Sequence, residues 1–175
     1  MKQLFLLMVA GSLLLSCSDI TDVVIKPESF ENIQEKFEQN RVAWEKQNIQ
    51  NYQFTRIWKW NVLPYDEPMT FEISEGKNPI LINPESHPIF ITEFPENIQA
   101  KSISEIFDRI KYCLSFIESV INGTHRGSKV KSIILDIKYH PEYHFPMEVI
   151  YHVQYVDNLI GGKFFKVNVT EFIPR

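Results

Sequence analysis

The sequence predicts an α+β domain: an antiparallel sheet of about five to six strands with two helices packed on one face, in the order helix, strands, helix, strands. Three observations predict this fold class. Apolar residues recur at helical spacing in two stretches, apolar and polar residues alternate in several others, and successive strand-like stretches are separated by short turns. Strands joined by short turns pair antiparallel, because a parallel pair needs a long crossover connection.

The first helix is predicted over residues 29–48. Its apolar positions at helical spacing are Phe30, Ile33, Phe37 and Trp44. Arg41 interrupts this stripe, and the other positions are rich in Glu, Gln, Asn and Lys, as expected of a solvent-exposed face. Ser29 is a candidate N-cap and Asn48 is a candidate stop.

The first group of strands follows this helix. Side chains alternate in residues 52–60 and again in residues 69–73. A turn at residues 75–78 then precedes a short apolar strand at residues 80–82. Prolines break the pattern in residues 83–101, so this segment is predicted to be a loop.

The second helix is predicted between a capping box and a glycine. Ser102 and Glu105 have the spacing of a capping box, and Gly123 supplies the stop. The apolar stripe between them consists of Ile103, Ile106, Phe107, Ile110, Cys113, Leu114, Ile117 and Ile121. This stripe predicts that Cys113 is buried, where a thiol has a raised pKa and low reactivity.

Three further strands complete the predicted domain. The residues that share a face are Ile133, Leu135, Ile137 and Tyr139, then Met147, Val149, Tyr151 and Val153, then Phe165, Val167 and Val169. Turns are predicted between them at residues 141–146 and 157–162.

The first residues have the parts of an export signal. Lys2 gives a short positive region, and the apolar stretch after it is about a dozen residues long, too short to span a bilayer as a helix. The stretch ends in Leu14-Leu15-Ser16-Cys17, which resembles a lipobox. We therefore expect a signal peptide at 1–16, a lipidated N-terminus and tether at 17–28, and a single domain at 29–175. The alternative is an ordinary secretory signal in which Cys17 is incidental.

Lipidation of Cys17 defines the expected location. Acyl chains such as palmitate would hold the protein on the cell membrane or the outer membrane, facing the periplasm or the exterior. Without Lys2, 17 basic residues stand against 22 acidic ones, which argues against a nucleic-acid partner and for mild repulsion from anionic headgroups. Cys113 is the one other cysteine, so no internal disulfide is expected.

One strand carries a candidate binding surface. Arg56, Trp58 and Trp60 share a face with Tyr52 and Phe54. If this face is core, Arg56 must reach water or a carboxylate. If it is exposed, a cation among aromatic rings makes a binding surface. The core alternative is favoured, because the first helix needs a sheet face to cover.

A second candidate site is a group of histidines near one predicted hairpin. His140, His144 and His152 could bind zinc or copper if they converged. Alternation places His152 on the face opposite Val149, so no metal site is predicted. No nucleophile is paired with a base at a credible spacing, so neither an enzyme nor a cofactor is predicted.

Residues from about 40 to 175 also resemble a family of small bacterial domains of unknown function, many of them lipoproteins. The matching motifs are Trp44, Ile49 and the Tyr52-x-Phe54 pair, residues 103–108 of the second helix, and residues 139–146 of the hairpin. Two departures stand out. Relatives often carry a pair of cysteines where this chain has Trp58 and Trp60, and their usual glycine before the aromatic-proline step is His144 here. The resemblance implies a fold and an envelope location, and it implies no activity.

Together these features predict a non-enzymatic binding or assembly module, anchored to the bacterial cell envelope by lipid and acting on an envelope protein partner. The alternative is a periplasmic lipoprotein that binds a metal or a small ligand through His140, His144 and His152. A partner-binding module would expose an apolar patch of several hundred Å², whereas a ligand binder would have a deep pocket.

Overall fold

The computed structural model describes residues 27–60, 68–83, 100–157 and 162–175. The predicted signal peptide and most of the predicted tether lie outside the described residues. The same holds for most of the predicted loop at 83–101 and for part of the turn at 157–162.

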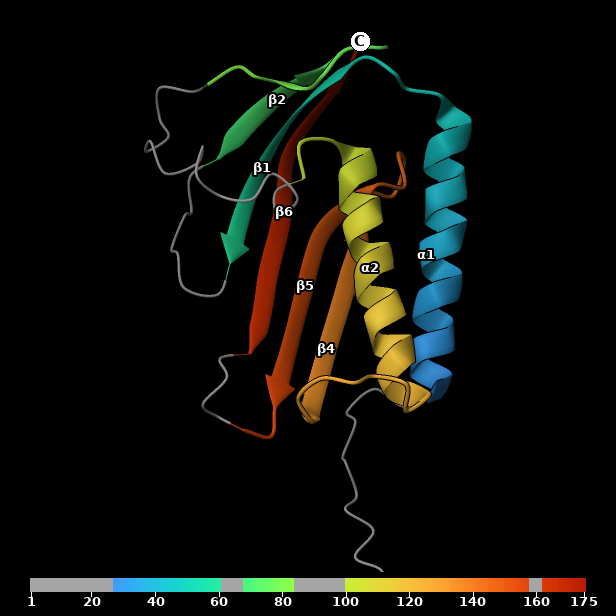
Figure 1. Cartoon of the computed structure of the whole chain (residues 1–175). Coiled ribbons are helices and arrows are strands. Elements are labelled where there is room, and N and C mark those ends of the chain that lie inside the picture. Colours follow the sequence, from blue (N-terminus) through green and yellow to red (C-terminus); the bar gives the residue numbers. More distant parts are fainter. Residues whose placement is uncertain (1–26, 61–67, 84–99, 158–161) are drawn as a thin grey trace, which may run out of the picture.

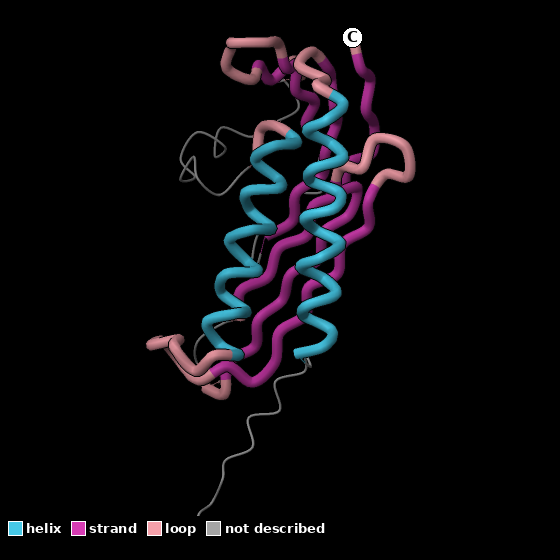
Figure 2. Tube along the Cα trace, turned by 90° about the vertical axis from the view of Figure 1, so that its right-hand side faces the viewer, coloured by secondary structure: helices cyan, strands magenta, loops and turns pink. Residues whose placement is uncertain are grey.

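The described part of the chain forms a six-stranded antiparallel sheet in the order β3-β2-β1-β6-β5-β4, with both helices on one side (Figures 1 and 2). The elements are α1 (Pro27–Gln47), β1 (Tyr52–Trp60), β2 (Met69–Ile73), β3 (Ile80–Leu81), α2 (Ile103–Ile121), β4 (Val130–Tyr139), β5 (Pro146–Tyr155) and β6 (Lys163–Pro174). The predicted α+β class and the order of its elements are therefore confirmed. Each half of the domain is one helix followed by three strands.

The two halves join where β1 pairs with β6 in the middle of the sheet. The register shifts after Thr55, and Arg56 lies opposite Val169. Thr170 is therefore an extra residue in β6, a β-bulge. Because one inserted residue reverses the alternation of side chains, Val169 and Phe172 can both turn toward the helices.

Helix α1 begins at Pro27, two residues before the predicted start at Ser29. Proline suits the first turn, where its missing N–H has no partner in any case. Residues 27 and 28, assigned above to the tether, therefore belong to the domain. Asn48, at φ +51°, donates its backbone N–H to the carbonyl of Glu45 and ends the helix as predicted.

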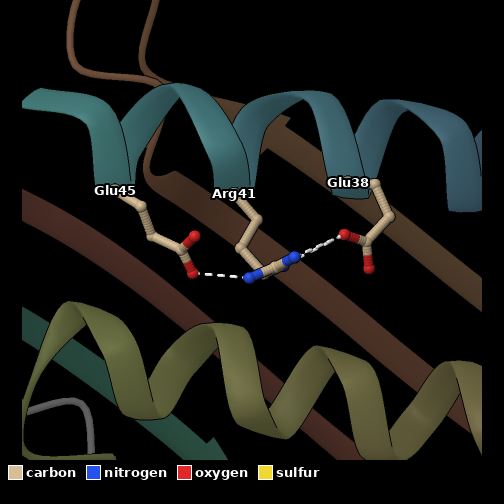
Figure 3. A network of polar contacts seen from close by, with 3 residues as sticks. All are labelled: Glu38, Arg41 and Glu45. Carbon is tan, nitrogen blue, oxygen red and sulfur yellow. Dashed lines mark hydrogen bonds and ion pairs between the residues drawn. The ribbon is translucent and has the colours of Figure 1, made fainter.

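The buried stripe of α1 is narrow. Phe30, Phe37 and Trp44 are buried, and Arg41 lies among exposed residues of the helix. The guanidinium of Arg41 pairs with Glu38 at 2.8 Å and also with Glu45 (Figure 3). Such exposed pairs contribute only a few tenths of a kcal/mol, so α1 is held mainly by its apolar stripe.

Helix α2 has the predicted cap with one difference. The Ser102 hydroxyl accepts a hydrogen bond from the backbone N–H of Glu105 at 3.1 Å, but the Glu105 carboxylate accepts from Lys101 rather than from Ser102. Gly123, at φ +67°, follows the last turn as predicted. Of the predicted stripe, Ile103, Ile106, Phe107, Ile110, Cys113, Leu114 and Ile117 are buried, and Ile121 packs against them.

An aromatic cluster connects α1 to the sheet. The Trp44 ring contacts the rings of Tyr52, Phe145 and Phe172 edge-on, at 5.7–5.9 Å between centroids. These three residues come from β1, the β4–β5 hairpin and β6. One side chain of α1 therefore connects parts of the chain that are far apart in sequence, on the side of the sheet where α2 also packs.

Candidate functional site

The most unusual side chain of the domain is Arg56 of β1, which is 0% exposed. Its Nε donates a hydrogen bond to the carbonyl of Ala100, just before α2, at 2.6 Å. The guanidinium carbon lies 5.3 Å from the ring centroid of Trp58 and 5.0 Å from that of Phe71. The cation is therefore held against aromatic faces, within reach of cation–π attraction.

The terminal nitrogens of this guanidinium are not satisfied. Nη1 and Nη2 of Arg56 have no hydrogen-bond partner among the described residues, and neither has Nε1 of the buried Trp58. Burial lowers the pKa of Arg56 to about 10, and the charge of Glu105 opposes that shift in part. A buried donor without an acceptor costs about 1–3 kcal/mol, and more when it is charged. Three such donors thus lie on one face of β1.

This geometry decides between the two expectations for the strand. Arg56 and Trp58 are interior residues, so the expectation of an exposed binding surface there is wrong and the core alternative is right. The third residue, Trp60, ends β1 opposite Phe165, and its side chain lies outside the described part of the structure. The sequence could not settle this point, because alternation shows which residues share a face but not which face is covered.

The histidines do not converge. Nδ1 of His140 accepts hydrogen bonds from the backbone N–H groups of Glu142 and Tyr143 at 3.2 and 3.1 Å, so this nitrogen already holds the turn. His152 lies on β5 between Ile134 and Phe164 of the neighbouring strands, on the side away from the helices. No group of three His, Cys, Asp or Glu side chains within the described ranges could hold a metal ion.

His144 contributes to the hairpin through its backbone conformation rather than as a metal ligand. Its φ is +60°, in the left-handed region that favours glycine, and its backbone N–H donates to the carbonyl of His140 at 2.9 Å. The His140 ring stacks on the Phe145 ring, with 5.0 Å between the two ring centroids. Both residues therefore shape the hairpin between β4 and β5.

Cys113 is 1% exposed, and burial raises the pKa of its thiol to about 12. The positive charges of Arg109 and Lys163 oppose this shift but do not cancel it. The thiolate that a nucleophile or a metal ligand requires is therefore scarce at neutral pH. The burial predicted for Cys113 is confirmed.

The face of the sheet away from the helices carries a charged cluster that sequence reasoning missed. Glu148 of β5 accepts from Lys138 of β4 at 2.7 Å and pairs with Lys166 of β6 at 2.9 Å. These bonds lower the pKa of Glu148 below its ordinary value. The sequence does show opposite charges on these three strands. They can be recognised as a cluster only once the register of strand pairing is known, because the register decides which side chains are neighbours.

The described part of the surface has hollows beside both ends of α2, and neither is lined by Arg56, Trp58 or a histidine of the β4–β5 hairpin. One of about 360 Å³ lies beside the start of α2 and includes Tyr52 and Lys77 in its lining. The other, of about 290 Å³, lies beside the end of α2 and includes His125 and Lys129. Large exposed apolar residues are scattered over several elements, among them Tyr112 and Ile134.

Comparisons with models of protein families, with curated proteins and with solved structures find no match to this chain. The family resemblance of residues 40–175 thus depends on the sequence motifs alone. Of the two described helices, neither is long and apolar enough to cross a membrane.

Proposed function

We propose that this protein is a bacterial cell-envelope lipoprotein, held to the cell membrane or the outer membrane by lipid on Cys17 and facing the periplasm or the exterior. One observation supports the anchor above all: an export signal ends in the lipobox-like Leu14-Leu15-Ser16-Cys17, and a folded domain begins ten residues later, at Pro27. Two or three acyl chains give stable attachment, whereas a single chain gives only marginal binding.

A substitution at the cysteine tests the anchor. The Cys17→Ala protein should leave the membrane fraction or remain unprocessed, because it lacks the thiol that takes the lipid. A Ser18→Ala protein, changed next to the same site, should fractionate as the wild type does. Cys17→Ala protein that is processed and membrane-bound like the wild type would contradict the anchor.

For the domain itself we propose a binding role without catalysis, directed at a carboxylate group of an organic ligand. The buried guanidinium of Arg56 supports this role. Its Nη1 and Nη2 atoms have no hydrogen-bond partner within the described chain. The spacing of these two nitrogens matches that of the two oxygens of a carboxylate. Trp58 and Phe71 would contact an apolar body next to that carboxylate. Because Arg56 is fully buried, the domain must open for the ligand to enter, and association should be slow.

Thermal unfolding in benzoate tests this role, with chloride at the same ionic strength as the reference. A ligand at ten times its dissociation constant adds about 1.4 kcal/mol of stability, which raises the melting temperature of a domain of this size by about 3–5 °C. Benzoate should stabilise the wild type but not Arg56→Met. The control is Arg41→Met, which changes a residue on the surface of α1 and should be stabilised as the wild type is.

The same variants decide whether Arg56 lacks a partner in the free protein. Removing an unpaired buried cation should leave stability unchanged or raise it, by about 1–4 kcal/mol at most. A loss of about 3–5 kcal/mol in Arg56→Met, together with no benzoate effect on the wild type, would mean that the guanidinium is already paired and would refute the binding role.

A further inference from the structure

The two ends of the domain differ, and one of them is the end from which the tether leaves. Helix α1 starts, α2 stops and β4 starts at the lower end in Figure 1, while the C-terminus lies at the upper end. Val130 pairs with Tyr155, and the backbone N–H of Val156 donates to the carbonyl of Lys129 at 2.8 Å, so the end of β5 belongs here as well. We call this lower end the tether end.

Exposed cations gather at the tether end. They are Arg126 and Lys129 in the loop after α2, Lys131 near the start of β4, and Lys163 at the start of β6. Residues 119–135 contain three of these cations and no Asp or Glu. Within the described ranges, the acidic residues of this end are Glu28 and Glu31 in the first turns of α1, Glu118 in the last turn of α2 and Asp157 after β5, so the cations stand without carboxylates only in the loop after α2 and at the start of β4.

The tether restricts how far this end can move from a membrane. From Cys17 to Pro27 the chain is ten residues long, which spans at most about 35 Å even when fully extended. A short flexible connection keeps two sites at an effective concentration in the millimolar range. Attraction that would be too weak to recruit a free protein therefore becomes sufficient to orient a tethered one.

We propose that the tether end docks on the anionic phospholipid surface in which the Cys17 lipid is inserted. This inference depends on the proposed anchor. Cationic side chains near such a surface attract its anionic headgroups. Val156, 48% exposed at the same end, adds an apolar side chain that can contact the headgroup region.

The negative net charge of the chain does not oppose this orientation. Electrostatic interactions at physiological salt decay over about 8 Å. A ten-residue strand such as β4 is about 33 Å long, so carboxylates at the far end of the sheet are screened from the membrane. Only charges close to the surface count, and the cationic run in residues 119–135, which contains no Asp or Glu, attracts an anionic surface locally.

Hydrogen exchange of the mature lipidated protein in vesicles tests the docking. Amides of the loop 122–129 should exchange more slowly in vesicles of equal parts phosphatidylcholine and phosphatidylglycerol than in phosphatidylcholine alone. The difference should disappear in about 1 M salt, where the screening length falls to about 3 Å. It should also disappear in Arg126→Gln/Lys131→Gln, because each lost cation near the surface weakens adsorption about fivefold.

A matched control is available at the other end of the domain. Lys46 lies in the last turn of α1 and Lys77 in the turn after β2, and both are exposed. Lys46→Gln/Lys77→Gln makes the same change in net charge and should retain the slow exchange of the loop. Equal exchange in the two vesicles, or equal loss in both double variants, would overturn the docking while leaving the anchor intact. Protein that fails to float with the vesicles would overturn the anchor, and the docking with it.

Discussion

At the scale of single residues, the hairpin between β4 and β5 contains a strained position. His144 adopts φ +60° although it has a Cβ atom. The left-handed conformation costs a residue with a Cβ about 1–2 kcal/mol. The hairpin tolerates this because the His144 N–H, the His140 ring and the packed Phe145 together fix the turn.

We predict that His144→Gly raises the free energy of unfolding by up to about 1 kcal/mol. Glycine relieves the strain, and its greater freedom in the unfolded chain offsets part of that gain. Urea denaturation measures the change, with His144→Ala as the control, because alanine keeps the strained Cβ. A His144→Gly protein no more stable than His144→Ala would show that the backbone conformation is not the source of the strain.

Arg56 illustrates at the same scale what sequence reasoning can and cannot reach. The alternation of β1 correctly grouped Arg56 with the aromatic residues, and the need of α1 for a sheet face correctly favoured burial. The hydrogen bond to Ala100 could not be foreseen, because it joins two residues that are 44 positions apart in sequence. Unpaired donors become visible only after every neighbour has been placed.

At the scale of elements, α2 was the best predicted part of the chain because all its signals agree. The cap at Ser102, the stop at Gly123 and the continuous apolar stripe are local and concern the same segment. The strands were less well bounded: β4 starts at Val130 and β6 extends to Pro174, beyond the predicted alternation. The bulge at Thr170 explains part of this, since it interrupts the period of two and depends on pairing with β1.

Ile110 lies in the middle of the buried stripe of α2 and is 0% exposed. We predict that Ile110→Ala lowers the free energy of unfolding by about 2–5 kcal/mol, because it removes buried methyl groups and leaves a cavity. Denaturant titration measures this loss. Lys111→Ala, at the adjacent exposed position, should change stability by less than about 0.5 kcal/mol. Similar losses in both variants would contradict the packing of α2 on the sheet.

Glu148 joins three strands on the opposite face of the sheet, and its effect should depend on pH. Hydrogen bonds from Lys138 and Lys166 lower the pKa of this carboxyl in the folded protein below its value of 4.5 in the unfolded chain. Its contribution to stability is therefore complete above about pH 5 and is lost as pH falls through the folded pKa.

We predict that Glu148→Gln is less stable than the wild type at pH 7, by about 1 kcal/mol, and that the gap narrows as the pH falls below 4. Denaturation curves of both proteins across this range measure the gap. A gap that stays constant down to pH 2 would show that it arises from packing rather than from the ion pairs.

At the scale of the whole molecule, the main consequence of the fold is the separation of its ends. The antiparallel arrangement brings the start of α1, the loop after α2 and the start of β6 together. Arg126, Lys129 and Lys131 are close in sequence, but the negative total charge of the chain draws no attention to them. That this cationic run lies at the end where α1 begins follows only from the topology.

The proposed anchor is lipid on Cys17, which holds the folded domain on the envelope. Mass spectrometry of protein extracted from the membrane fraction tests it most directly. We expect an N-terminal peptide that begins at Cys17, lacks residues 1–16 and carries diacylglycerol on the Cys17 sulfur. Hydrolysis of the two ester bonds should release the fatty acids and leave a glyceryl group on that sulfur. An N-terminus elsewhere than Cys17, or an unmodified Cys17 thiol in membrane-bound protein, would contradict it.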